Sequence, residues 1–109
     1  FAEFGKLEAT EFTALQGSFD VIINATSASL DADVPPLPAG VFSGATLAYD
    51  MMYGKQPTVF MEFAHRHGAV TRDGLGMLVE QAAEAFLLWR GVRPETADVF
   101  SALRRQLSQ

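Results

Sequence analysis

Small hydroxylated and amide side chains follow an apolar run in the stretch FDVIINATSASL, residues 19–30. Asn24, Thr26 and Ser27 offer short hydrogen-bond donors and acceptors, and Ala25 lets a ligand approach the backbone closely. Ligands of parallel sheets bind beyond the carboxyl ends of the strands, so these residues would suit a ribose or a carboxamide there. The alternative is a polar turn that only caps the next element.

Two further apolar runs end in polar or soft residues. The run ATLAY is followed by Asp50, Met51, Met52 and Tyr53, and the run AVT is followed by Asp73, Gly74 and Met77. If the three runs are neighbouring parallel strands, their ends share one rim of the sheet. The alternatives are methionines that fill gaps in the core and a half-buried tyrosine with a solvated hydroxyl.

Gln81 follows Met77 by one helical turn in the stretch DGLGMLVEQAAEAFLLWRG. At about 100° per residue both lie roughly opposite the main apolar face of this helix. Covered by another domain, they would offer a thioether and an amide to a small polar ligand, and otherwise Gln81 is simply solvated. His65 and His67 are two residues apart on a predicted helix, which is not a metal-binding spacing.

The elements that must position these residues alternate between strands and helices. Predicted strands cover residues 6–12, 19–23, 45–49 and 69–71, and predicted helices cover residues 57–67, 74–90 and 95–107. The β-branched run at 19–23 predicts a central strand that is covered on both faces. Crossovers of roughly 20 residues or more allow parallel pairing, so the predicted class is α/β, a parallel sheet flanked by helices.

The composition narrows the function classes. The 109 residues predict one small domain, and a net charge of -5 argues against a protein that binds nucleic acid. No apolar run approaches the ~18 residues of a membrane span. The chain has no cysteine, which excludes disulfides and thiol nucleophiles and favours a cytoplasmic location. It starts at Phe1 rather than Met, so we expect a processed protein or a piece of a longer one.

Three stretches, FDVIINATSASL, YDMMY and above all DGLGMLVEQAAEAFLLWRG, resemble the C-terminal part of the shikimate dehydrogenase family. These enzymes reduce 3-dehydroshikimate with NADPH in aromatic amino-acid biosynthesis. The resemblance covers essentially the whole chain and is weakest before Phe19. It implies that residues 1–109 form the second half of a Rossmann-type NADP-binding domain, with a partial parallel sheet and closing C-terminal helices.

The resemblance also implies roles for individual residues. Contacts to NADP are implied for Asn24, Ala25, Thr26, Ser27, Met51, Gly74 and Met77, and contacts to the shikimate substrate for Tyr53 and Gln81. Among these, the carbonyl of Gly74 would hold the nicotinamide carboxamide and Met77 would pack on the nicotinamide ring. Tyr53 would lie beside the substrate carboxylate, and Gln81 would hydrogen-bond the substrate hydroxyls. No metal site is expected, because the spacing of His65 and His67 does not suit one.

Two parts of the family's machinery have no counterpart here. The family's proton-transferring lysine and aspartate lie in its N-terminal domain, and Gly74-Leu75-Gly76 lacks the G-x-G-x-x-G spacing of a diphosphate-binding turn. We therefore expect the chain alone to be inactive as a dehydrogenase. The alternatives are a quinate/shikimate dehydrogenase that uses NAD, or a non-catalytic binding or assembly module.

The usual Rossmann strand order, 3-2-1-4-5-6, makes a prediction about the sheet edges. This chain would hold strands 3 to 6 of that order, which leaves residues 6–12 and residues 19–23 each without a neighbouring strand. Open edges with apolar faces favour pairing with another chain. We therefore expect either self-association or displacement of residues 6–12 from the sheet.

Overall fold

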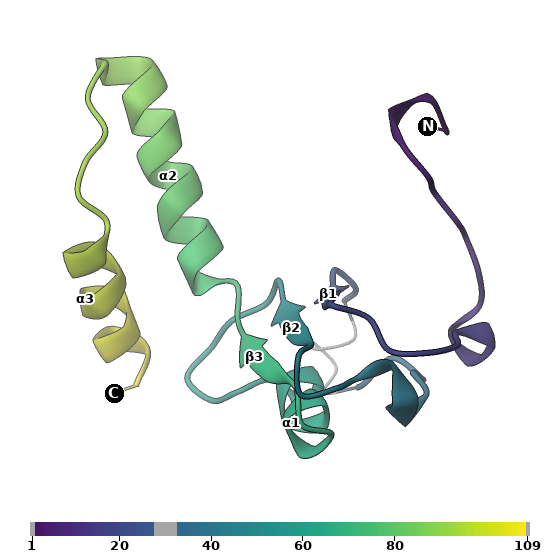
Figure 1. Cartoon of the computed structure of the whole chain (residues 1–109). Coiled ribbons are helices and arrows are strands. Elements are labelled where there is room, and N and C mark those ends of the chain that lie inside the picture. Colours follow the sequence, from purple (N-terminus) through teal and green to yellow (C-terminus); the bar gives the residue numbers. More distant parts are fainter. Residues whose placement is uncertain (1, 28–32, 109) are drawn as a thin grey trace.

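The computed structural model describes residues 2–27 and 33–108 (Figure 1). In this part of the chain, a parallel sheet has the order β1-β2-β3. Its strands are β1 (Val21–Asn24), β2 (Leu47–Asp50) and β3 (Val70–Arg72), and the α-helices are α1 (Val59–Arg66), α2 (Leu75–Arg90) and α3 (Ala97–Leu107). Short 3-10 helices cover Ala2–Phe4, Phe12–Ala14 and Ala39–Val41. The predicted class, a parallel sheet flanked by helices, is confirmed.

The register of the sheet brings the strand ends to one edge. Val21 of β1 pairs with Leu47 of β2, and Leu47 pairs with Val70 of β3. At the other end of the ladder, Asn24 pairs with Asp50. Because the strands are parallel and in step, the residues that follow each strand emerge on the same side of the sheet.

Helix α1 covers one face of the sheet and forms the core with it. Its Phe60 and Ala64 are fully buried, as is Ala48 of β2. The helix begins where the hydroxyl of Thr58 accepts a hydrogen bond from the Met61 amide (3.2 Å), which is the usual role of a threonine N-cap. The helix predicted from residue 57 is therefore present, with a start that is set by this cap.

The opposite face of the sheet is open in the described part of the chain. Val21 and Ile23 of β1 are 54% and 60% exposed, and Val70 of β3 is 48% exposed. The prediction that the run 19–23 is a central strand covered on both faces is wrong, since β1 lies at an edge of this sheet. A continuous apolar run is compatible with a strand that is buried on both faces. The strand is buried only where other segments of the protein pack against both faces.

The predicted strand at residues 6–12 is also wrong. Residues 6–11 have no strand or helix assignment, and Phe12 begins a 3-10 helix. Figure 1 shows this N-terminal segment, in purple, running away from the sheet. An alternating pattern becomes a strand only beside a partner backbone, and residues 6–12 are displaced from the sheet, the second of the two outcomes expected above.

Helices α2 and α3 form an arm that projects from the sheet (Figure 1). Leu75, Val79 and Ala83 of α2 are buried, and the arm turns back after Gly91, which has the left-handed φ of 75° that favours glycine. Trp89, near the end of α2, is 80% exposed. The arm and the extended N-terminal segment give a radius of gyration of 16.3 Å, against about 13 Å for a compact domain of this length.

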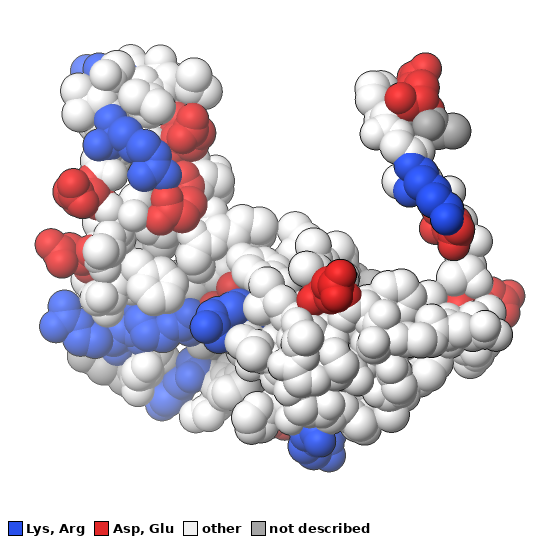
Figure 2. Space-filling model, viewed as in Figure 1, with Lys and Arg blue, Asp and Glu red and all other residues white. Residues whose placement is uncertain are grey.

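Ion pairs hold the segment that connects α2 to α3. The guanidinium of Arg93 bonds the carboxylates of Glu80 and Glu84 on α2. Hydrogen bonds from Arg93 and Thr96 lower the pKa of Glu80. In Figure 2 acidic and basic side chains are interspersed on the α2–α3 arm, whereas the body around the sheet is mostly uncharged on the face shown. On this face the arm is thus more highly charged than the body around the sheet.

Candidate functional site

Backbone hydrogen bonds tie the three strand ends to one another. The amide of Met51 donates to the carbonyl oxygen of Asn24 (3.1 Å), and the amide of Gly74 donates to the carbonyl oxygen of Met52 (3.0 Å). The turns that follow β1, β2 and β3 therefore form one rim. This is the convergence that the parallel order predicts.

Gly74 is the closest point of contact in this rim. A Cβ atom on Gly74 would lie 2.0 Å from the carbonyl oxygen of Met51, so no side chain fits there. The carbonyl oxygen of Gly74 accepts the hydrogen bond from the Leu78 amide that begins α2 (3.0 Å). A carbonyl oxygen has a second lone pair, so this atom can still accept a bond from a ligand amide.

A buried carboxylate lies beneath the rim. Asp50 is fully buried, and its oxygens accept hydrogen bonds from the Met52 amide (2.9 Å), the Thr58 hydroxyl (2.7 Å) and the side-chain amide of Asn24 (3.3 Å). In the sequence, Asp50 is visible only as the residue that ends an apolar run. The signal that could have revealed it is an acidic residue at a strand end shortly before a threonine N-cap, Thr58.

The side chain of Asn24 shapes the turn after β1. Its Oδ1 accepts hydrogen bonds from both the amide (3.1 Å) and the hydroxyl (2.6 Å) of Thr26. Asn24 is buried, whereas Ala25, Thr26 and Ser27 are exposed. The segment is thus a hydrogen-bonded turn that presents three small residues, Ala25, Thr26 and Ser27, at the rim.

The remaining site residues of the sequence analysis lie on two elements. Met51 and Tyr53 are partly exposed after β2. Met77 and Gln81 are exposed on α2, and the helical spacing places them roughly opposite the side that packs on α3. The amide nitrogen of Gln81 donates to the Leu78 carbonyl (3.1 Å). Neither Met77 nor Gln81 belongs to the buried core.

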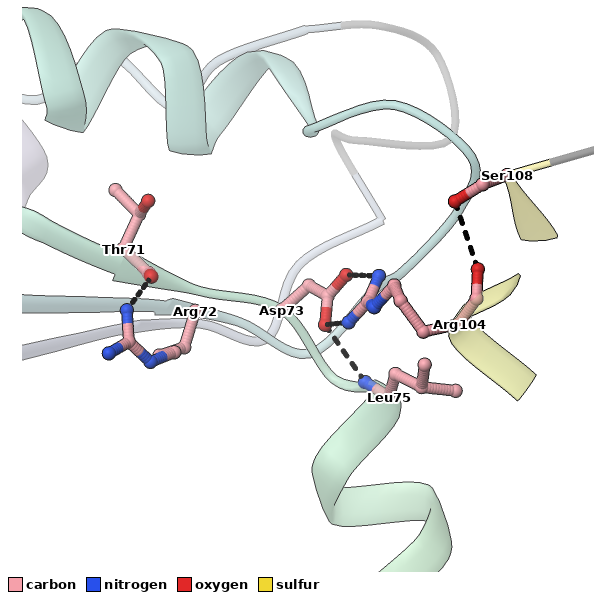
Figure 3. Close-up of polar contacts among 6 residues, drawn as sticks. All are labelled: Thr71, Arg72, Asp73, Leu75, Arg104 and Ser108. Carbon is pink, nitrogen blue, oxygen red and sulfur yellow. Dashed lines mark hydrogen bonds and ion pairs between the residues drawn. The ribbon is translucent and has the colours of Figure 1, made fainter. Parts of the chain in front are cut away.

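An ion pair fixes the arm at the root of α2 (Figure 3). The guanidinium of Arg104 on α3 bonds both carboxylate oxygens of Asp73 (2.7 and 2.8 Å), and Asp73 also accepts from the Leu75 amide (3.2 Å). This pair is not predictable from the sequence, because the residues lie 31 positions apart and no local pattern links them. The pair places α3 beside the turn that contains Gly74.

The pKa of Asp73 reflects this arrangement. Partial burial acts to raise it, but the hydrogen bonds from Arg104 and from the Leu75 amide, with the nearby charge of Arg104, bring it below the ordinary value of 3.8. A carboxyl group whose pKa is lower in the folded state stabilises that state above its unfolded pKa. This stabilisation is lost as the pH falls from 3.8 through the folded-state pKa.

Arg104→Met is expected to lower the free energy of unfolding of the full-length protein at neutral pH by about 1 kcal/mol, a modest value because the Arg104 side chain is partly exposed and screened by solvent. Urea unfolding at a series of pH values would measure it. The difference from the unsubstituted protein should shrink as the pH falls from 3.8 through the lowered pKa of Asp73, since the carboxylate of the folded protein becomes protonated there.

Arg105→Met is the matched control, because Arg105 is the exposed neighbour on the same helix. Its free energy of unfolding should stay within about 0.5 kcal/mol of the unsubstituted protein at every pH. Equal losses for the two variants would show that the Asp73–Arg104 pair does not hold the arm.

The surroundings of the two histidines are not those of metal ligands. The ring of His67 packs against Phe42 and Phe63, and its Nδ1 lies 2.8 Å from the Phe63 carbonyl oxygen, whereas His65 is exposed on α1. Among the described residues, no group of three or more His, Cys, Asp or Glu is placed to hold a metal. No described helix is long and apolar enough to cross a bilayer.

Comparison with known proteins identifies relatives of this region. Residues 74–104 match the family described as the shikimate 5'-dehydrogenase C-terminal domain. A shikimate dehydrogenase (NADP(+)) of Herminiimonas arsenicoxydans is 64% identical over 107 residues, which are 98% of this chain and 39% of that protein.

Solved structures agree with the sequence matches. An Ael1 enzyme from Pseudomonas putida has a TM-score of 0.78 and 54% identity, covering 92% of this chain and 36% of its own. The shikimate 5-dehydrogenase of Thermus thermophilus, solved with NADP(H) and shikimate, has a TM-score of 0.68 and 36% identity, covering 81% of this chain and 34% of its own. The chain spans about two fifths of the length of the curated relatives it matches. In sequence and in fold, it is similar to part of shikimate dehydrogenases, as its motifs predict.

Proposed function

We propose that the chain is part of an NADP-dependent shikimate dehydrogenase, which interconverts 3-dehydroshikimate and shikimate, and that it builds the nicotinamide side of the active site. The observation that carries the proposal is the rim, where hydrogen bonds join the turns at Asn24, Met51–Met52 and Gly74. Relatives named shikimate dehydrogenase (NADP(+)) match the chain along almost its whole length and so support the same activity.

The rim suits the nicotinamide end of a dinucleotide. Residues 24–27 would face the ribose and diphosphate, since their exposed members are small and two of them, Thr26 and Ser27, are polar. The Gly74 carbonyl would accept from the carboxamide, and the partly exposed thioethers of Met51 and Met77 would contact the cofactor, with Met77 against the ring. Bound NADPH would supply the hydride for reduction and NADP⁺ would accept it in the reverse direction, and these residues would orient the nicotinamide ring.

The substrate would bind next to this ring. Tyr53 is partly exposed at the rim and would lie beside the substrate carboxylate. Gln81 is exposed on α2, and its amide can both donate to and accept from substrate hydroxyls. Proton transfer and diphosphate binding would come from the rest of the protein, so the chain alone would be inactive. In this proposal the enzyme acts in the cytoplasm, in aromatic amino-acid biosynthesis.

The test is an assay of the full-length protein for shikimate-dependent reduction of NADP⁺, followed by the absorbance of NADPH. We expect activity for the full-length protein and none for the 109-residue chain. Gln81→Leu should raise the KM for shikimate by about 10-fold, because a substrate hydroxyl loses its partner, and should leave the KM for NADP⁺ unchanged. Gln106→Leu, at an exposed glutamine of α3, is the control. A full-length protein without shikimate-dependent activity would refute the proposal.

The isolated chain is expected to self-associate. Val21 and Ile23 are exposed on β1, which is an edge strand, and such an edge can pair with another chain. Light scattering over a concentration series should show growth in mass for the unsubstituted chain. Ile23→Lys should reduce this association, because a charge on an edge strand blocks pairing. A chain that is monomeric at all concentrations would contradict the expectation.

A further inference from the structure

Asp50 is a buried acid to which the proposed reaction assigns no part. It lies at the end of β2, below the rim, and is fully buried. Its carboxylate accepts hydrogen bonds that originate from three segments, at Asn24 after β1, at Met52 after β2 and at Thr58 before α1. One side chain therefore connects two of the rim's turns and the start of the helix behind them.

The hydrogen bonds of Asp50 set the direction of the Asn24 amide. A carboxylate only accepts hydrogen bonds, so Asn24 must turn its NH₂ group toward Asp50 (3.3 Å). Its Oδ1 then points the other way, where it accepts from the amide (3.1 Å) and the hydroxyl (2.6 Å) of Thr26. Asp50 thus fixes the orientation of the Asn24 amide, and Asn24 in turn fixes the turn at residues 24–27 through its bonds to Thr26.

The same carboxylate fixes the second turn of the rim. It accepts from the Met52 amide, and Met52 in turn accepts from the Gly74 amide through its carbonyl oxygen. Thr58, which donates to Asp50, also caps α1 through the Met61 amide. The turns after β1 and β2 are therefore positioned by one buried group relative to a helix that is part of the core.

We propose that Asp50 is a positioning residue for the cofactor: by orienting the Asn24 amide it gives the turn at residues 24–27 the shape that binds NADP. The inference rests on the proposed function, because that function places NADP against this turn. Asp50 itself, being fully buried, acts through Asn24 rather than by touching the ligand.

Exchanging the two side chains tests this directly in the full-length protein. Asp50→Asn brings an NH₂ group toward the NH₂ group of Asn24, and Asn24→Asp brings two carboxylates together. Each single variant should raise the dissociation constant for NADP⁺, measured by titration calorimetry, by about tenfold, the size expected for a lost buried bond to a charged group. In the double variant the new amide at position 50 can donate to the new carboxylate at position 24, whose second oxygen can still accept from Thr26. The dissociation constant should then return to within about threefold of the original value.

Hydrogen exchange of the backbone gives a second readout that needs no cofactor. The Thr26 amide is bonded to Asn24 Oδ1, so its exchange should be faster in each single variant and slow again in the double variant. Thr46→Val is the matched control for a loss of stability. Thr46 is fully buried just before β2, at the other end of the sheet, where its hydroxyl donates to the Phe19 carbonyl oxygen. This variant should be less stable but should bind NADP⁺ as before.

The outcomes separate the two proposals. Unchanged NADP⁺ affinity in Asp50→Asn, a double variant no better than the single ones, or an equal loss of affinity in Thr46→Val would each overturn the role of Asp50. A full-length protein that binds no NADP⁺ would overturn the proposed function instead. In that case the exchange of the Thr26 amide still decides whether Asp50 shapes the turn.

Discussion

Gly74→Ala is expected to lower the free energy of unfolding of the full-length protein by about 3 kcal/mol, at the upper end for overpacking. The new Cβ would lie 2.0 Å from the oxygen and 2.7 Å from the carbon of the Met51 carbonyl group. These are backbone atoms in a hydrogen-bonded turn, so they cannot rotate away as a flexible side chain does. Urea unfolding measures the loss, and the displaced Met51 turn should also weaken NADP⁺ binding in titration calorimetry.

Gly76→Ala is the control, two residues along the same chain. Its Cβ would meet only the Phe100 ring, at an ordinary contact distance of 3.7 Å. Because Gly76 lies within α2, the alanine should stabilise the protein by about 0.5–1 kcal/mol. A similar loss for both glycines would show that close approach to Met51 is not what requires a glycine at position 74.

The second large effect is expected in the core below the sheet. Phe60→Ala removes a fully buried ring that packs beside the Phe42 ring, with a centroid separation of 6.2 Å, and should cost about 3–5 kcal/mol of unfolding free energy. The cost combines lost burial with the cavity that remains. Thermal or urea unfolding of the full-length protein measures it, with a fall in the midpoint.

Phe4→Ala provides the comparison, since the Phe4 side chain is 78% exposed in the N-terminal segment. Its effect should stay within about 0.5 kcal/mol, as for other exposed positions. If Phe4→Ala were as destabilising as Phe60→Ala, the burial of the Phe60 ring would not account for the loss at that position.

The sequence predicted the elements that local patterns determine. The helix ended by Gly91 and the strands near residues 45–49 and 69–71 lie within about two residues of their predicted bounds, the usual uncertainty of such boundaries. The convergence of the turns at Asn24, Met51 and Gly74 also followed, because parallel strand order alone brings those ends together. The binding roles of these residues remain predictions.

The sequence did not predict features that depend on distant or missing partners. Residues 6–12 alternate like a strand but lie away from the sheet, and Ile23 is apolar but exposed. Asp73 and Arg104 pair across 31 positions, and the bonds of Asp50 join residues up to 26 positions apart. Patterns within a few residues carry no information about such pairs, whereas a three-dimensional arrangement determines them directly.

The attachment of α2 at its first turn has a mechanical consequence for the distance between Gln81 and the rim. Gln81 lies seven residues beyond Gly74, so it stands about 10 Å along the helix axis from the point of attachment. Treating α2 as a rigid lever, a tilt of about 10° at its base would carry Gln81 through an arc of roughly 2 Å, given the ~1.5 Å rise per residue. That displacement is most of a hydrogen-bond length. The Asp73–Arg104 ion pair lies at the base of α2, where such a tilt would have to start.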